Sequence, residues 1–237
     1  MNILLTNDDG YQSPSIHRIK ERLRLEGHEV YLVAPKYNNS GVSMAISLKN
    51  GVTVEAVDQY EYIVEGTPAD CIIFAVEKVI KNRAIDLVIS GVNNGANIGY
   101  ETFYSGTVGA ARLAHVYGMN ALAISYNHFT PSEAEVELCV NYVVDLVNKY
   151  YEIQDFMPYY LNVNIPYPVK ENLDYEFSKL GKRTYENQLQ DHPECPEHII
   201  KFYYSGTVIE DDEPGTDSHT IANGKIAITK LNGLQIV

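Results

Sequence analysis

The chain has 237 residues, which is enough for one sizeable domain or for one domain with a smaller unit appended. Hydrophobic residues make up 45% and charged residues 21%, so the chain is too apolar to be disordered. The formal net charge of −13 argues against binding of a nucleic acid polymer, because Lys and Arg give no surplus to neutralise its phosphates. An anionic substrate must therefore be held by backbone N–H groups, by a metal ion or by a few local cations.

Short apolar runs alternate with amphipathic segments in the first half of the chain. The pattern predicts strands at 3–5, 30–33, 52–57, 62–64, 86–90 and 121–125. It predicts helices at 16–25, 67–81, 106–117 and 132–150. Strand–helix–strand alternation implies right-handed crossovers, so we expect an α/β protein with a Rossmann-like, doubly wound and mainly parallel sheet.

Beyond residue 160 the pattern changes to shorter pieces that are rich in Tyr and interrupted by Pro. Strands are expected here at 161–165, 199–204, 207–210 and 226–229. We interpret this part as a C-terminal antiparallel β appendage. The predicted domains are a Rossmann-like catalytic core at 1–160 and a partly extended appendage at 161–237 that contributes to oligomerisation.

The cysteines and the apolar runs bear on where the protein acts. Cys71, Cys139 and Cys195 lie far apart and form no C-x-x-C pair, which favours a reducing compartment over a disulfide framework. No run reaches the roughly 20 apolar residues of a membrane helix, and the apolar run at 3–5 is too short for a signal peptide. We therefore predict a cytoplasmic protein without a membrane partner.

The loop at 7–10, Asn-Asp-Asp-Gly, follows the first predicted strand. Ligands of open α/β sheets bind beyond the carboxyl ends of the strands, where this loop lies. The adjacent carboxylates of Asp8 and Asp9 repel each other unless a cation lies beside them, and Mg²⁺ or Mn²⁺ prefers such oxygen ligands. A solvated turn is the other interpretation, since Asp and Gly are common in turns.

Two further loops follow predicted strands at the same edge of the sheet. The loop at 37–43 brings Asn39 or Ser40 within reach of the same ion. The loop at 90–99 carries three Asn amides and leads to Ser105, Gly106 and Thr107. These three residues open a helix whose free N–H groups suit a phosphate. The alternative is an ordinary Ser N-cap.

Several other frameworks are excluded by motifs that the sequence lacks. No G-x-G-x-x-G follows Leu5, no P-loop motif occurs, and the paired acids are D-D rather than D-x-D. A covalent aspartyl route is therefore disfavoured, which leaves metal-assisted attack by water. The residues of 105–108, Ser-Gly-Thr-Val, recur at 205–208 without a helical pattern after them, so we assign that copy to a turn and a strand.

Taken together, these blocks closely resemble the SurE family, the stationary-phase survival nucleotidases. The resemblance rests on T-N-D-D-G at 6–10, S-G at 40–41, G-T-P-A-D-C at 66–71, S-G-V-N-x-G-x-N-x-G at 90–99 and Y-S-G-T-V at 104–108. It implies a 5′/3′-nucleotidase that hydrolyses nucleoside monophosphates, with one divalent metal ion per subunit, Mg²⁺ or Mn²⁺, in a homodimer or homotetramer. A non-catalytic module that senses nucleotides with the same phosphate cradle is the alternative.

The resemblance also assigns roles to individual residues by motif position. The implied metal ligands are Asp8, Asp9, Ser40 and Asn93. Asp8 and Asp9 are also the implied catalytic residues. The implied phosphate-binding residues are Asn97, Ser105, Gly106 and Thr107.

Overall fold

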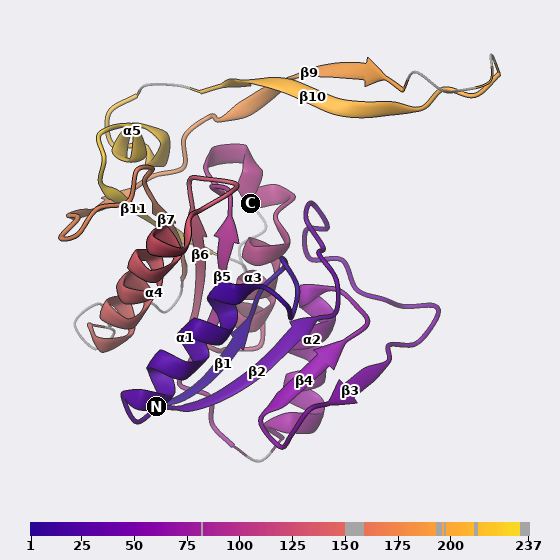
Figure 1. Cartoon of the computed structure of the whole chain (residues 1–237), viewed down its shortest axis with the longest axis vertical. Coiled ribbons are helices and arrows are strands. Elements are labelled where there is room, and N and C mark those ends of the chain that lie inside the picture. The colour runs from indigo at the N-terminus through magenta and orange to yellow at the C-terminus, as the bar shows by residue number, and fades with distance from the viewer. Residues whose placement is uncertain (82, 150–158, 193–195, 197, 211–212, 233–237) are drawn as a thin grey trace.

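The computed structural model describes residues 1–81, 83–149, 159–192, 196, 198–210 and 213–232. One nine-stranded sheet forms the centre of the molecule, in the order β3-β4-β2-β1-β5-β6-β7-β11-β8. Its strands are β1 (Asn2–Thr6), β2 (Glu29–Pro35), β3 (Val54–Ala56), β4 (Glu61–Val64), β5 (Leu87–Asn94), β6 (Ala121–Tyr126), β7 (Tyr160–Ile165), β8 (Tyr175–Ser178) and β11 (Ile226–Leu231). Figure 1 shows the helices packed around this sheet.

The sheet is mainly parallel, as the sequence predicts. From β4 to β7 every neighbouring pair of strands is parallel. The antiparallel pairs of this sheet are β3 with β4 and β11 with β7. The α/β fold class is therefore confirmed, with its antiparallel additions at the two sides.

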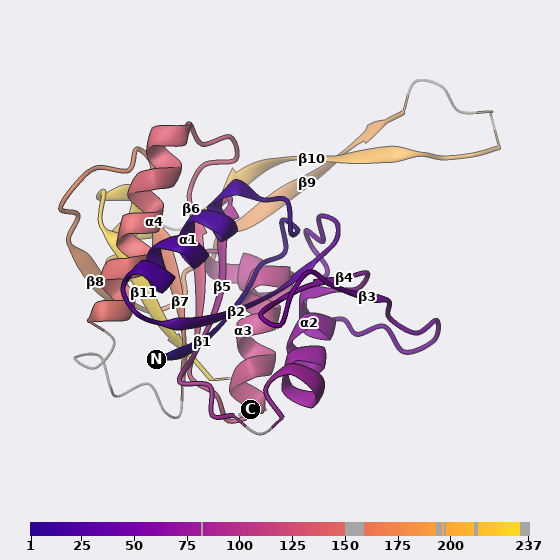
Figure 2. The same ribbon diagram turned by 60° about the horizontal axis from the view of Figure 1, so that its bottom comes forward.

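The helices cover both faces of the sheet, which makes the fold doubly wound. They are α1 (Pro14–Leu25), α2 (Pro68–Phe74), α3 (Gly106–Val116), α4 (Glu133–Asn148) and α5 (Asp217–Ala222), with a π-helical turn η1 (Ala75–Val79) and a 3₁₀ helix η2 (Gly99–Phe103). Side chains of α1 and α4 share one buried cluster with Ile3 and Leu5. Side chains of α2 and α3 share another with Leu4, because successive strand residues face opposite sides. Figure 2 shows the two layers from a second direction.

Two of the helices begin with a capping box, in which the N-cap residue and the third helical residue exchange hydrogen bonds. At α2 the Thr67 hydroxyl accepts the Asp70 N–H at 3.1 Å, and Asp70 accepts the Thr67 N–H at 2.9 Å. At α4 the same exchange joins Ser132 and Glu135. Each box satisfies N–H groups that a helix start leaves open, so both starts are set by local sequence.

The main sheet continues past residue 160, where the sequence pattern changes. β7 pairs in parallel with β6, and all six of its residues are buried. β8 and β11 extend the same sheet, so strands of one sheet lie on both sides of the predicted domain boundary. The separate unit within the described residues is a two-stranded antiparallel hairpin of β9 (Thr184–Asp191) and β10 (Phe202–Ile209).

The predicted strands at 199–204 and 207–210 are one strand, β10, so their separation is wrong. Gly206 pairs in register with Asn187 and does not interrupt the ladder. The second Ser-Gly-Thr-Val copy, at 205–208, lies wholly within this strand. The predicted strand is therefore confirmed, and the predicted turn at this copy is wrong. β8, β9 and α5 were not expected.

The described residues also bear on the cysteines and on membrane insertion. Cys71 and Cys139 are buried and have free thiols, and Cys195 lies outside the described residues. Within the described part of the chain, no helix combines the length and the apolar character needed to cross a membrane.

Candidate active site

The predicted site lies at one edge of the sheet because its loops follow neighbouring parallel strands. β1 pairs with β2 on one side and with β5 on the other. Their carboxyl ends therefore meet at one edge, and the loops after all three strands lie side by side. Asp8 and Asp9 follow β1, Ser40 follows β2, and Asn93 lies at the end of β5.

β5 reaches further than the predicted strand at 86–90, and this extension places Asn93. The strand continues to Asn94 through a register shift between Ser90 and Asn93. Gly91 has a φ of +131°, and a Cβ on it would lie 2.2 Å from the carbonyl oxygen of Ile124. Only glycine fits this backbone, which brings Asn93 beside Ser125 of β6.

Asp8 is held against the N-terminus of α3. Its side chain is buried, and one carboxylate oxygen accepts a hydrogen bond from the Thr107 hydroxyl. A Cβ on Gly106 would lie 2.9 Å from the Cβ of Asp8, so glycine at this position permits the close approach. Burial raises the pKa of Asp8, against the lowering effect of the Thr107 hydroxyl and nearby backbone N–H groups.

Asp9 lies beside Asp8 and is bonded to both of the other loops. One oxygen accepts the Asn94 N–H at 3.3 Å, and the other accepts the side-chain amide of Asn38 at 3.5 Å. Burial and then the charge of Asp8 raise the pKa of Asp9 to about 6. Two carboxylates are thus crowded together in a site that opposes their ionisation.

Ser40 and Asn93 lie next to residues that contact Asp9. The Ser40 N–H donates to the Asn38 side chain at 2.9 Å, and Asn38 in turn contacts Asp9. The Asn93 amide nitrogen donates to the Gly95 carbonyl at 2.8 Å, which leaves the amide oxygen as its other polar atom. Each of the two loops therefore carries an uncharged side-chain oxygen within two residues of a contact to Asp9.

The donor set fits a hard divalent cation. Within the described residues, no Lys or Arg forms an ion pair with Asp8 or Asp9. Nor do the described residues contain a group of three or more His, Cys, Asp or Glu arranged to hold a metal. Two carboxylates, a hydroxyl and an amide offer oxygen ligands of the kind that Mg²⁺ and Mn²⁺ prefer. A bound cation would also supply the positive charge needed to balance the two carboxylates.

Ser105 is the N-cap of α3, as one of the two interpretations expects. Its hydroxyl accepts the Val108 N–H at 3.1 Å, and the helix begins at Gly106. This cap leaves the N–H groups of Gly106 and Thr107 at the end of the helix that faces Asp8. A capped helix and a phosphate cradle are therefore compatible here.

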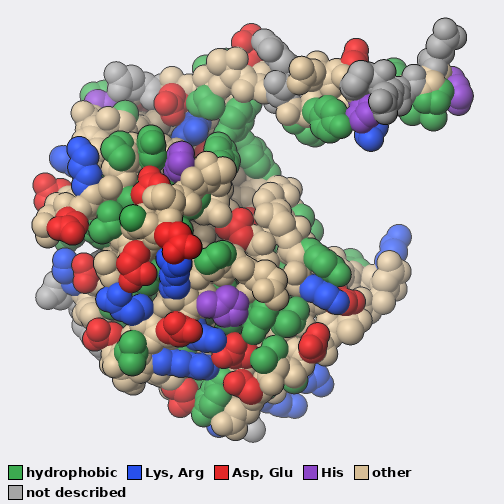
Figure 3. Space-filling model, viewed as in Figure 1, with side chains coloured by type: hydrophobic (Ala, Val, Ile, Leu, Met, Phe, Trp, Pro, Cys, Tyr) green, Lys and Arg blue, Asp and Glu red, His purple; other side chains and the backbone are tan. Residues whose placement is uncertain are grey.

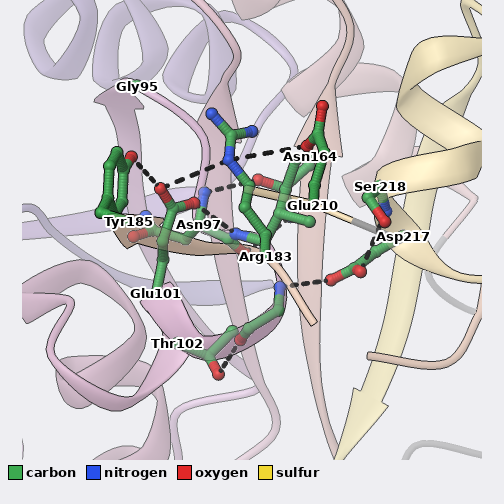
Figure 4. Close-up of polar contacts among 12 residues, drawn as sticks. Gly95, Asn97, Glu101, Thr102, Asn164, Arg183, Tyr185, Glu210, Asp217 and Ser218 are labelled. Atoms are coloured by element: carbon green, nitrogen blue, oxygen red, sulfur yellow. Dashed lines mark hydrogen bonds and ion pairs between the residues drawn. The ribbon is translucent and has the colours of Figure 1, made fainter. Parts of the chain in front are cut away.

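Asn97 is bonded into the interior beside the site. Its side-chain amide donates to the Ser125 hydroxyl at 2.7 Å, and its N–H donates to the Asn164 side chain at 2.8 Å. Asn162 donates to the Asn97 carbonyl at 2.7 Å, and Figure 4 shows Asn97 beside Asn164. These hydrogen bonds join Asn97 to β6 and β7, and they anchor the loop between β5 and α3.

Sequence reasoning overlooked two residues that contact Asp9, namely Asn38 and Asn94. Each lies close to a predicted metal ligand, in loops that carry consecutive Asn residues at 38–39 and 93–94. These paired Asn residues are the feature of the sequence that could have indicated the two contacts. Which Asn of a pair faces the carboxylate depends on backbone geometry, because the Asn94 contact uses its N–H rather than its side chain.

The fold and the site define a doubly wound α/β protein whose paired carboxylates adjoin a helix N-terminus suited to a phosphate group. The family model described as "Survival protein SurE" matches residues 3–187. The chain therefore belongs to the SurE family.

Similar proteins cover nearly the whole chain. The 5′-nucleotidase SurE of Leptospira biflexa is 34% identical over 98% of this chain and 93% of that protein. The 5′-nucleotidase SurE of Vibrio cholerae is 34% identical over 98% of this chain and 91% of its own length. The crystal structure of the SurE protein from Aquifex aeolicus matches with a TM-score of 0.84 and 31% identity, covering 100% of this chain and 95% of that one.

Proposed function

We propose that the protein is a metal-dependent phosphomonoesterase that hydrolyses nucleoside monophosphates to nucleoside and phosphate, as a 5′/3′-nucleotidase. The observation that carries the proposal is the contact between the buried Asp8 carboxylate and Thr107 at the N-terminus of α3, with Asp9 alongside. A cation site and a phosphate cradle thereby share one edge of the sheet. The relatives in Leptospira and Vibrio are named 5′-nucleotidases, which supports the substrate class.

The proposed ligands of one divalent cation, Mg²⁺ or Mn²⁺, are Asp8, Asp9, Ser40 and Asn93. Such an ion supplies positive charge that polarises a phosphate group and acidifies water. Asp8 and Asp9 bind it as carboxylates, and one of them also accepts the proton of the attacking water. Asn38 and the Asn94 N–H orient Asp9 for this work through their hydrogen bonds.

The phosphate is held by the start of α3 and by the loop before it. The N–H groups of Gly106 and Thr107 lie at the helix end beside Asp8 and stabilise charge on the phosphoryl oxygens. The Thr107 hydroxyl donates a hydrogen bond to Asp8 and so holds the carboxylate next to this helix end. Ser105 fixes the first turn of the helix through its cap. Asn97 contributes by anchoring the loop against Ser125. This phosphate site uses backbone N–H groups and no Lys or Arg side chain of the described residues. Such a site suits a chain of net charge −13, which has few cationic side chains to spare.

Release of phosphate from AMP tests the proposal. We expect turnover with Mn²⁺ or Mg²⁺, none after treatment with EDTA, and recovery when the metal is restored, because the ligands are oxygen atoms. Hydrolysis that continues unchanged in chelator would refute the metal mechanism. Tight binding of AMP without any release of phosphate would instead favour the non-catalytic sensing module, which the names of the relatives do not support.

The proposed assembly is a homodimer or homotetramer in which the β9–β10 hairpin contributes contacts. The hairpin projects from the body of the molecule, and Figure 3 shows a hollow between the two. Its exposed large apolar side chains include Leu189, Phe202, Tyr203, Tyr204, Val208 and Ile209. A two-stranded hairpin is marginally stable alone, and exposed apolar groups of this extent mark interaction surfaces. The cytoplasmic location stays a prediction from cysteine usage.

A further inference from the structure

The base of the hairpin contacts the loop that precedes α3. Figure 4 shows Tyr185 and Arg183 of the hairpin side directed to Glu101 of η2. The Tyr185 hydroxyl donates to the Glu101 carboxylate, and the Arg183 guanidinium lies 3.6 Å from the same oxygen. We call these three residues the Glu101 cluster.

Glu101 carries this contact directly to the start of α3. The second oxygen of its carboxylate accepts the Ile98 N–H at 3.0 Å. Its backbone carbonyl accepts the N–H of Ser105, the N-cap of α3, at 3.1 Å. Thr107, two residues further on, donates to Asp8. One buried residue thus connects the hairpin to the helix end that faces the carboxylate pair.

The backbone around the Glu101 cluster is also closely fitted. The Tyr100 N–H donates to the Arg183 carbonyl at 3.2 Å. Gly99 has a φ of +55°, and a Cβ on it would lie 2.6 Å from the backbone nitrogen of Arg183. The buried Asp217 carboxylate accepts both the Gly99 N–H at 2.9 Å and the Gly181 N–H at 2.7 Å. The segment before β9 and the loop before α3 are therefore locked together at several points.

Charge adds to this fit. The Arg183 side chain is 12% exposed and lies between two carboxylates, at 3.6 Å from Glu101 and 3.8 Å from Glu210, which directly follows β10. The β9 side of the hairpin base therefore contacts η2 directly, and Glu210 on the β10 side contacts it only through Arg183. If one member of a buried ion pair is removed, the charge of the remaining member is left without compensation. The loop would then have to move so that this charge could reach solvent.

We propose that Glu101, Arg183 and Tyr185 are positioning residues that set the phosphate-binding end of α3, so that the hairpin base is a working part of the active site. The proposal deepens the proposed function and rests on it for the kinetic assay. A phosphate cradle must be placed to within a fraction of an ångström, and displacement of about 1 Å can cost as much as 100-fold in rate. The Glu101 cluster supplies this placement from residues more than 80 positions apart in the chain.

The test compares three variants of the full chain with wild type. Tyr185→Phe removes one donor to Glu101. Glu101→Gln removes the charge and keeps one side-chain oxygen, which can replace the acceptor of Ile98 or that of Tyr185 but not both. Glu101→Ala removes the charge and both acceptor oxygens. Affinity for inorganic phosphate is measured by calorimetry in Mn²⁺ buffer, and kcat and KM are measured with AMP. Tyr117→Phe is the matched control, because Tyr117 is exposed at the opposite end of α3.

We expect Glu101→Ala to weaken phosphate binding and lower kcat/KM by at least about tenfold. Tyr185→Phe and Glu101→Gln should show smaller losses, and Tyr117→Phe should match wild type. A folded Glu101→Ala protein with wild-type phosphate affinity would overturn the proposal. If that variant does not fold, wild-type affinity in Tyr185→Phe would overturn it instead. Because phosphate binding needs no turnover, failure of AMP hydrolysis alone would count against the proposed function and not against this one.

Discussion

The strand ends of the main sheet and the β9–β10 hairpin differ in which groups they bury. At the carboxyl ends of β1 and β5, Asp8 is 3% exposed, and hydrogen bonds join it to α3. In the hairpin, apolar side chains face solvent, and Tyr204 is 83% exposed. The carboxylates at the strand ends are buried and have no cationic partner among the described residues. The apolar side chains of the hairpin are exposed to solvent, with no covering element among the described residues.

The difference indicates what each region is for. Crowded carboxylates that resist ionisation are suited to a small cation, since a cation restores the balance of charge. Exposed apolar side chains on a hairpin without a core are suited to another protein surface. The first region therefore predicts a ligand site and the second predicts an interface, and the Glu101 cluster lies where the two regions meet.

Neutralising either carboxylate should have the largest effect. We expect Asp8→Asn and Asp9→Asn each to lose most of the turnover of AMP, about 100-fold or more, because each removes a metal ligand and charge. In metal-free protein the same variants should melt at or above the wild-type temperature, because they relieve repulsion between neighbouring carboxylates. Apo variants that melt well below wild type while retaining turnover would show that the pair is only a structural turn.

A charge on the hairpin should alter assembly while leaving the site intact. We expect wild type to have the mass of a dimer or tetramer by light scattering, and Tyr204→Lys to form a smaller assembly, because burial of a lysine opposes association. Leu25→Lys at the end of α1 is the matched control, since Tyr204 and Leu25 are both 83% exposed. Equal masses for Tyr204→Lys and wild type would show that the hairpin is not part of the interface.

The smallest expected effect concerns a helix start in the main body, where local sequence sets the structure. Ser132→Ala should cost about 1 kcal/mol of unfolding free energy at neutral pH by removing the cap of α4. Ser13→Ala is the control, because Ser13 is an N-cap whose side chain makes no capping bond. Urea unfolding measures both.

The cost of Ser132→Ala should also depend on pH. Bonds from Ser132 and then Tyr126 lower the pKa of Glu135 from 4.5 to about 2. A lowered pKa stabilises the fold above the unfolded value of 4.5, and that contribution is lost as the pH falls towards 2. The cost of Ser132→Ala should therefore shrink over this range. A cost that is the same at pH 7 and at pH 2.5 would contradict the role of Glu135.

The sequence predicted those features that local chemistry decides. The buried parallel strands and the helix starts near Thr67, Gly106 and Ser132 follow from spacing and residue type. The two Ser-Gly-Thr-Val copies make this plain, because one opens α3 and the other lies in β10, as the residues after each copy predict.

Features that depend on distant contacts could not be predicted. Asp217 accepts the N–H of Gly99, 118 residues away in the chain, and no local pattern marks that pairing. The Asn97 side chain, in the loop after β5, is held by a hydrogen bond to Ser125 of β6, 28 residues away in the chain. β7 continues the main sheet although the composition changes at its first residue, because its pairing with β6 is fixed by tertiary packing rather than by its own sequence.

Direct titration of Mn²⁺ into metal-free wild type and Asp9→Asn tests the central claim most closely. The claim is that the carboxylate pair beside α3 holds one divalent ion in each subunit. Calorimetry should give one binding site per chain in wild type and at least a tenfold weaker site in Asp9→Asn, because one of two charged ligands is gone. Equal affinity and stoichiometry in the two proteins would contradict the claim and place any metal elsewhere in the molecule.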